Sequence, residues 1–333
     1  MSYVQALIGL TILVFAGDFL VRGAVALAKR MGVSTLVIGL TIIAFGTSAP
    51  ELVVAIKAIF SGAGGLAMGN VVGSNIANVL LVIGLPALLA PICCSVPRVT
   101  RNLIFMLIIS CMFVYIANGF TLFGYEIGGH FTWVEGIPLV ALLLWFLIYS
   151  ALRSKAHPEE KDPTEIEFKE LEELEEAPLR LRASLAMVIA GLIGLAVGAD
   201  LLVDSAIIIA RGLGVSEEVI GLTLVAIGTS LPELVTALVA AVRKHYDVAI
   251  GNVIGSNIFN ILGIVGIASF FGEIPVSETL LRIDLWVMLG TSALLLPFCA
   301  FQGSIGRYVG ALMLIGYGSY MYHLMHVGSV VGA

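Results

Sequence analysis

Charged residues are scarce in this chain. Only 12% of its 333 residues are charged, whereas 59% are hydrophobic, and the mean hydropathy is +1.06. A soluble fold of this length cannot bury so large a hydrophobic fraction. The composition therefore excludes an ordinary soluble domain and predicts a multi-pass membrane protein.

Cysteines are also few. Cys93, Cys94, Cys111 and Cys299 lack the spacing of a metal site, and three of them lie in or beside apolar runs. We interpret them as packing residues and expect neither a disulfide framework nor a zinc site. A cleavable signal is not indicated either, because no basic residue precedes the first apolar run and Asp18 interrupts it. We read that run as the first membrane span.

Ten apolar stretches are long enough to cross about 30 Å of hydrocarbon at about 1.5 Å per residue. They lie at about 3–29, 34–60, 66–90, 102–119, 132–152, 183–210, 216–242, 246–271, 281–301 and 305–326. Five crossings in each half, an odd number, place the two halves in opposite orientations. We predict an all-α integral membrane protein with a first five-helix repeat (1–152), an acidic linker (153–182) and a second five-helix repeat (183–333).

Lysine and arginine are distributed unevenly over the connecting segments. With the N-terminus outside, the inner segments hold fourteen of them and the outer segments three. Cytoplasmic loops carry the positive excess, so both termini are predicted outside and the linker in the cytoplasm. We expect a monomer in the plasma (inner) membrane of a prokaryote, surrounded by the lipid bilayer.

The net charge of −6 is concentrated in the linker, so it gives no indication of a nucleic-acid partner. Asp162 and Pro163 form a plausible helix start, and an acidic helix follows over Glu167–Glu176. The segment lacks the glycine turn of an oxygen-ligand loop for cations. This favours a solvated linker, with a cation sensor as the alternative.

Two motifs occur once in each half at one offset. The segment Ala-Phe-Gly-Thr-Ser-Ala-Pro-Glu-Leu at 44–52 returns as Ala-Ile-Gly-Thr-Ser-Leu-Pro-Glu-Leu at 226–234, and Gly-Asn-Val-Val-Gly-Ser-Asn-Ile-Ala-Asn at 69–78 returns in similar form at 251–260. Asp18 and Asp200 keep the same offset of 182 residues, so the duplication extends beyond the motifs. Asp18 can pair with Arg22, and Asp200 lies near Asp204; because both sets lie toward a membrane boundary, we favour a structural or interfacial role over transport.

Glu51 and Glu233 fall near the middle of the second and seventh spans. An unpaired carboxylate there costs at least ~2.5 kcal/mol on insertion scales, and no lysine or arginine lies within a helical turn in sequence. A bound cation is the natural compensation. Hydroxyls lie three and four positions before each glutamate, which places them on the same or an adjoining helix face. They belong to Thr47, Ser48, Thr229 and Ser230.

Further oxygens flank these carboxylates. Pro50 and Pro232 have no N–H to donate, which leaves the carbonyls of Gly46 and Gly228 without helical donors. In the third and eighth spans, a serine and an asparagine four residues apart present a hydroxyl and an amide oxygen on one face. These pairs are Ser74 with Asn78 and Ser256 with Asn260. Such hard oxygen ligands suit Na+ or Ca2+ rather than zinc, copper or iron.

Two structural or enzymatic alternatives compete with this interpretation. The small residues at 69 and 73 are typical of helix packing in membranes. The Gly-Thr-Ser segment could hold a serine nucleophile, but the five histidines fall in loops or near membrane edges, so no base is at hand. We therefore expect a transporter and not an enzyme.

With these motifs, Gly-Thr-Ser-x-Pro-Glu followed by Gly-Ser-Asn-x-x-Asn, nearly the whole chain resembles the sodium/calcium exchanger family of the cation/calcium antiporter superfamily. The resemblance implies ten helices in two inverted five-helix repeats, with the first and sixth spans long, oblique and mobile. It implies Ca2+ bound by Glu51, Glu233, Thr47 and Thr229, with Asn78 and Asn260 at the centre. It also implies flanking Na+ sites formed by Ser48, Ser74, Ser230, Ser256 and the carbonyls of Ala44 and Ala226.

The resemblance further implies a secondary antiporter that moves Ca2+ outward against inward Na+, three per Ca2+, with no cofactor. Asn260 stands where archaeal and potassium-dependent relatives carry aspartate, which argues against potassium coupling. A proton-coupled cation antiporter is the alternative, although that branch has different repeat motifs. A cation channel built on the same oxygen-lined site is a third possibility.

Overall fold

The computed structural model describes residues 2–94, 97–122, 125–127, 129–156, 180–212, 226–301 and 303–331. The first half contains α1 (Ser2–Met31), α2 (Thr35–Ile38), η1 (Gly39–Ile43), α3 (Ala44–Thr47), α4 (Ala49–Phe60), α5 (Gly64–Ala77), η2 (Asn78–Ile83), α6 (Gly84–Leu89), β1 (Ile92–Cys93), α7 (Pro97–Ala117), β2 (Phe120–Leu122), β3 (Tyr125–Ile127), β4 (His130–Phe131) and α8 (Trp133–Ala156). The elements marked η are short π-helical segments.

The second half contains α10 (Leu181–Gly212), α12 (Ala226–Thr229), α13 (Leu231–Val242), α14 (Tyr246–Phe259), η4 (Asn260–Val265), α15 (Gly266–Ala268), β5 (Ile274–Pro275), η5 (Leu280–Asp284), α16 (Leu285–Leu294), α17 (Leu296–Ala300), β6 (Ser304–Ile305) and α18 (Arg307–Val331). The predicted acidic helix and the start of the predicted seventh span, up to residue 225, lie outside the described residues.

Several helices have the length and apolar character of membrane spans. Within the described ranges there are seven, or eight if the bent pair Thr35–Thr47 and Ala49–Phe60 counts as one span. These include the predicted first, third, fourth, fifth, sixth, eighth and ninth spans, whose observed limits agree with the predicted ones to within a few residues. A polytopic helical protein is therefore confirmed.

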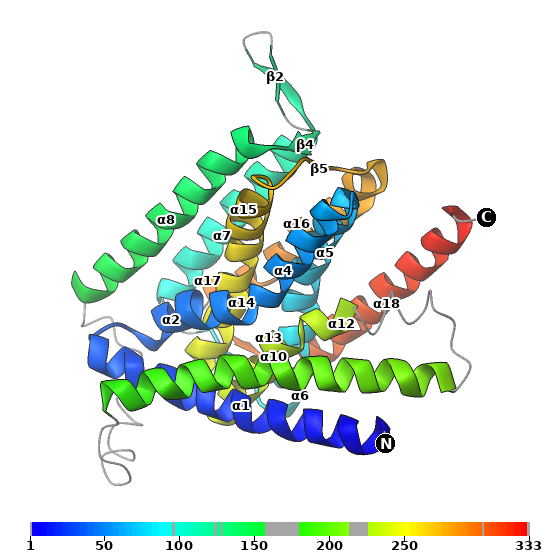
Figure 1. Cartoon of the computed structure of the whole chain (residues 1–333). Coiled ribbons are helices and arrows are strands. Elements are labelled where there is room, and N and C mark those ends of the chain that lie inside the picture. The colour runs from blue at the N-terminus through cyan, green and yellow to red at the C-terminus, as the bar shows by residue number, and fades with distance from the viewer. Residues whose placement is uncertain are drawn as a thin grey trace.

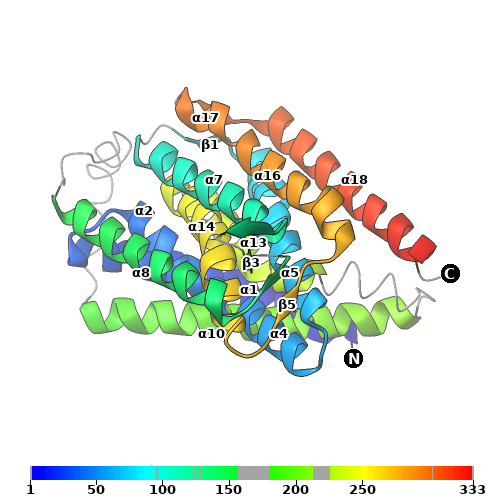
Figure 2. The same cartoon turned by 90° about the horizontal axis from the view of Figure 1, so that it is seen from above.

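The two longest helices, α1 and α10, lie side by side across one side of the molecule (Figures 1 and 2). They run antiparallel, because Gly9 packs on Gly198 near one end and Leu20 on Gly191 farther along. A Cβ at Gly191 would come within 2.7 Å of the Leu20 backbone nitrogen. Glycine at these positions allows the two backbones to approach closely.

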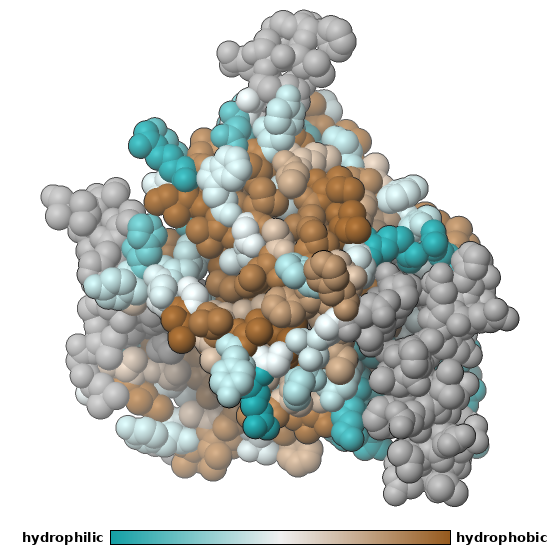
Figure 3. All heavy atoms as spheres, turned by 180° about the vertical axis from the view of Figure 1, so that it is seen from behind, coloured by the Kyte–Doolittle hydropathy of each residue, from teal (hydrophilic) through white to brown (hydrophobic). Residues whose placement is uncertain are grey.

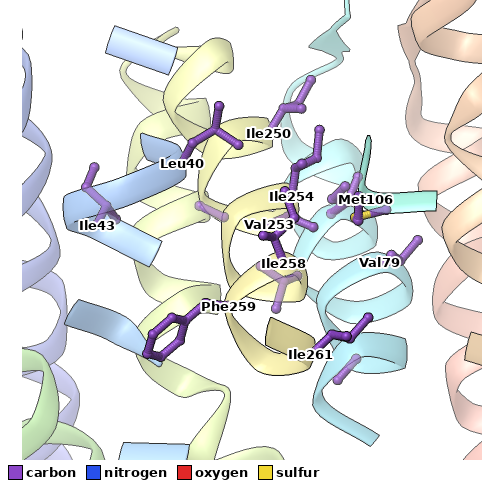
Figure 4. Close-up of a cluster of buried hydrophobic side chains, with 14 of the residues drawn as sticks. Leu40, Ile43, Val79, Met106, Ile250, Val253, Ile254, Ile258, Phe259 and Ile261 are labelled. Carbon is purple, nitrogen blue, oxygen red and sulfur yellow. The ribbon is translucent and has the colours of Figure 1, made fainter. Parts of the chain in front are cut away.

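The helix α14 and its continuation through η4 form the centre of the molecule. Every residue from 248 to 266 is buried. Figure 4 shows Ile250, Ile254 and Ile258 packed toward the segment that carries Val79. Large apolar side chains elsewhere face outward, and hydrophobic residues extend across the middle of the face in Figure 3. Such a surface is what a lipid-facing protein presents.

Short strand pairs, which the sequence did not predict, join the two halves of the chain. Antiparallel β1 and β6 pair Ile92 with Ile305, and antiparallel β4 and β5 pair Phe131 with Ile274. Beside the first pair, the free thiols of Cys94 and Cys299 are buried, and Cys94 Sγ lies 3.9 Å from the carbonyl oxygen of Ile92. The burial of Cys94 and Cys299 agrees with the interpretation of these two as packing residues, whereas Cys111 is exposed.

Candidate ion-binding site

Both copies of the first motif lie where a helix is broken. The break between α3 and α4 falls at Ser48 (φ −87°, ψ 7°) and that between α12 and α13 at Ser230 (φ −87°, ψ 2°). At the first break the helix bends by 41°. Pro50 and Pro232 occupy the second position of the following helices, where a missing N–H is tolerated. The predicted local opening of these spans is thus present in both halves.

The glycine of each motif also faces the long helix α10. A Cβ on Gly46 would lie 2.4 Å from Leu192 Cδ2, and one on Gly228 would lie 2.6 Å from Val203 Cγ2. Real carbon atoms do not approach so closely. The two glycines therefore permit α10 to pack directly against both helix breaks.

Both copies of the second motif end in a π-helical segment. The segment η2 begins at Asn78 and η4 begins at Asn260, the last residue of the motif in each copy. A π-helical turn has one extra residue, and such turns are frequent at functional sites. No feature of the sequence predicted this local change in helical period.

The two carboxylates lie close together inside the protein. Glu51 and Glu233 are each 1% exposed, and their carboxylates interact electrostatically. Ser48 Oγ donates a hydrogen bond to Glu233 Oε1 over 2.8 Å, which joins the broken helix of one half to that of the other. Thr47 Oγ1 lies 3.3 Å from both Asn252 Oδ1 and the carbonyl oxygen of Ala44.

Most of the predicted ligands are buried on the elements that meet here. We call the following set the central polar cluster: Thr47, Ser48, Glu51, Ser74, Asn78, Ser230, Glu233, Ser256 and Asn260. Thr229 is partly exposed, Ala226 begins α12, and the carbonyl of Ala44 already accepts the Ser48 N–H over 3.0 Å.

Six oxygens of the central polar cluster are buried with no hydrogen-bond partner in the described part of the chain. They are Glu51 Oε2, Asn78 Oδ1, Ser230 Oγ, Glu233 Oε2, Ser256 Oγ and Asn260 Oδ1. A buried polar atom without a partner costs about 1 to 3 kcal/mol, and more when it is charged. Bound hard cations would supply the partners that these oxygens lack.

The ligand chemistry differs from that of a transition-metal site. In the described ranges, no three His, Cys, Asp or Glu residues come together as possible metal ligands. The cluster instead combines two carboxylates with neutral hydroxyl and amide oxygens. Such oxygen ligands match the preferences of Na+ and Ca2+.

The aspartates outside the motifs lie apart from these contacts. Asp18 forms an ion pair with Arg243, and its carboxylate lies 3.9 Å from Arg22. Asp200 and Asp204 are exposed on α10. The Asp18–Arg243 pair, which the sequence did not predict, links α1 to the residue that follows α13.

Four residues that the sequence did not predict as part of the site contact the cluster or its neighbours: Asn75, Asn252, Asn257 and Met288. The three asparagines lie inside the two copies of the second motif, 69–78 and 251–260. Because the motif recurs in both halves, its asparagines could have been predicted as part of the site. Met288 lies outside the motifs and carries no such signal.

The chain is similar to known proteins over most of its length. The sequence model described as sodium/calcium exchanger protein matches residues 1–152 and 183–326. The sodium/calcium exchanger MaX1 of Methanosarcina acetivorans is 34% identical, over 98% of this chain and 99% of its own. The membrane protein MJ0091 of Methanocaldococcus jannaschii is 37% identical, over 93% and 94%.

A solved structure is similar over the same extent. The sodium-calcium exchanger NCX_Mj superimposes with a TM-score of 0.80 at 33% identity, covering 97% of this chain and 98% of that one. The matched segments include both copies of both motifs. This chain belongs to the sodium/calcium exchanger family.

Proposed function

We propose that the protein is a Na+/Ca2+ antiporter in which the two ions take turns in the central polar cluster. The observation that carries the proposal is the set of six buried oxygens that lack hydrogen-bond partners among the described residues. All six are acceptors or hydroxyls, and none is an amide nitrogen. Two of them belong to carboxylates, whose combined charge of −2 would neutralise one Ca2+.

The proposed ligand assignment is the one that the resemblance to the sodium/calcium exchanger family implies. Glu51 and Glu233, with Thr47 and Thr229, would hold Ca2+. The hydroxyls of the four motif serines, Ser48, Ser74, Ser230 and Ser256, and the carbonyls of Ala44 and Ala226 would complete flanking Na+ sites. Asn78 and Asn260 would contribute at the centre.

The proposed architecture has ten spans in two inverted repeats, with both termini outside a prokaryotic plasma membrane. Fourteen inner basic residues against three outer ones support this orientation. The pairing of α1 with α10 through glycines supports a two-helix unit that moves against the other helices. Such relative motion would expose the midplane site to each side in turn.

A stoichiometry of three Na+ per Ca2+ supplies enough free energy for Ca2+ extrusion. At about 100 mV each inward charge yields about 2.3 kcal/mol, and a tenfold Na+ gradient adds about 1.4 kcal/mol per ion. Three Na+ thus supply about 11 kcal/mol against about 4.6 kcal/mol for expelling two charges. The remaining 6.5 kcal/mol, roughly, sustains a Ca2+ gradient of more than four decades.

Isotopic Ca2+ uptake into vesicles that contain the purified protein tests this function. We expect uptake when the vesicles are loaded with Na+ and none when they are loaded with choline. Uptake with neither internal Na+ nor a proton gradient would indicate a channel. Uptake driven by an acidic vesicle interior in place of Na+ would indicate a proton-coupled antiporter.

A further inference from the structure

Two asparagines outside the proposed ligand set lie directly behind the two amide ligands. Asn75 is on α5 and Asn257 is on α14, and both are 1% exposed. Asn260 Nδ2 donates to Asn75 Oδ1 over 3.1 Å. Asn78 Nδ2 donates to Asn257 Oδ1 over 3.0 Å. The two contacts are equivalent in the repeats and cross from one half of the chain to the other.

These contacts leave the amide oxygens of Asn78 and Asn260 for the ions. An amide has an oxygen that accepts and an NH2 that donates, and it can rotate by 180°. In both residues the NH2 is bound by the supporting asparagine, while Oδ1 is buried without a partner among the described residues. A rotated amide would present N–H groups to a cation and place two oxygens in contact behind it.

The supporting amides are themselves oriented by atoms that can only accept. Asn75 Nδ2 donates to the thioether sulfur of Met288 over 3.5 Å. Asn257 Nδ2 lies 3.4 Å from the backbone carbonyl oxygen of Asn75. Neither a thioether nor a carbonyl can donate a hydrogen bond. In each chain of contacts every NH2 group therefore donates away from the central polar cluster, and the amide oxygen of Asn260 or Asn78 faces the cluster.

We propose that Asn75 and Asn257 are positioning residues that hold the amide oxygens of Asn260 and Asn78 toward the transported ions, with Met288 fixing the orientation of Asn75. The inference rests on the proposed function. Contacts that served only to join α5 to η4 and α14 to η2 would account for the amide nitrogens. They would leave the two inward oxygens without a role.

The test is Asn75→Leu, which keeps the branched arrangement of four side-chain heavy atoms and removes the acceptor behind Asn260. Loss of such supporting hydrogen bonds costs metal sites about 10-fold to 100-fold in affinity. We expect the half-saturating concentration of Na+ or Ca2+ in vesicle exchange to rise by about that factor. The maximal rate at saturating ion should change by less than about threefold, since the remaining ligands are intact.

Asn102→Leu serves as the matched control, because Asn102 is a buried amide on α7 outside the proposed ligand set. Its half-saturating concentrations should equal those of the wild type. In an Asn260→Ala background, Asn75→Leu should add less than about a twofold effect, because its partner is already gone. A full additional loss in that background would contradict a role through Asn260.

The outcomes separate the inference from the proposed function. If the wild type shows no Na+-dependent Ca2+ exchange, the proposed function fails and the inference fails with it. If the wild type exchanges and Asn75→Leu keeps both half-saturating concentrations, the inference alone is overturned. If Asn75→Leu does not fold, the volume-conserving Met288→Leu decides: a rise of at least about threefold supports the inference, and wild-type values refute it.

Discussion

Replacing Glu233 by glutamine removes one of the two charges in the central polar cluster while it keeps the side-chain shape. The glutamine oxygen can still accept the hydrogen bond from Ser48 that Glu233 Oε1 accepts over 2.8 Å. The substituted side chain also stays in a site that is 1% exposed. The change therefore acts on the charge presented to the ion and not on helix packing.

The magnitude follows from the burial of this carboxylate. Water screens it little, so its loss resembles the removal of one member of a buried ion pair, which costs about 3 to 5 kcal/mol. At about 1.4 kcal/mol per tenfold, this lowers the affinity for Ca2+ roughly 100-fold to 4,000-fold. Without ions the variant should be at least as stable as the wild type, because an unpaired buried charge has been removed.

The assay is the Ca2+ dependence of Na+-driven uptake, together with thermal unfolding in detergent without ions. Glu278→Gln is the control, since the Glu278 side chain is 76% exposed and pairs only with Arg282 four residues on among the described residues. It should leave the Ca2+ dependence unchanged. Na+-driven uptake by folded Glu233→Gln with the half-saturation of the wild type would refute the assignment of this carboxylate as a ligand.

Three further predictions concern other parts of the chain. Asn260→Asp adds a carboxylate to the cluster and makes protonation of the cluster easier, so acid inhibition of Na+-driven Ca2+ flux should move to higher pH. Wild-type flux should not require K+. Superimposed pH profiles of the two proteins would place residue 260 outside the ion cluster. Replacing the five glutamates of residues 170–176 by glutamine should leave the half-saturating Ca2+ concentration unchanged, and a shift of several-fold would favour the cation-sensor alternative. Gly255→Ala would bring a Cβ within 2.5 Å of the Leu40 carbonyl oxygen and should destabilise the protein by about 1 to 3 kcal/mol in thermal unfolding; Gly318→Ala, with open space around it, should not, and equal melting temperatures would contradict this packing.

The sequence predicted those parts of the site that depend on local spacing. Glu51 with Thr47, and Ser74 with Asn78, are four residues apart, and helical geometry alone places such residues on one face. The helix breaks followed from Pro50 and its copy. Duplication of both motifs then indicated that the two sets act together.

Contacts between distant segments could not be predicted in the same way. The hydrogen bond of Asn75 with Asn260 joins helices whose relative height depends on the packing of the whole bundle. The pairing of β1 with β6 depends on loops that carry no alternating apolar pattern. The π-helical start at Asn78 is a local adjustment within a sequence that is equally compatible with a regular helix.

Equilibrium binding of isotopic Ca2+ to the purified protein, with rising concentrations of Na+, tests most directly whether one cluster serves both ions. We predict that Na+ displaces bound Ca2+ completely and competitively, with a dependence on Na+ concentration steeper than first order, because more than one Na+ replaces each Ca2+. Ca2+ that stays bound at saturating Na+, or simultaneous binding of both ions with unchanged affinities, would contradict a shared site.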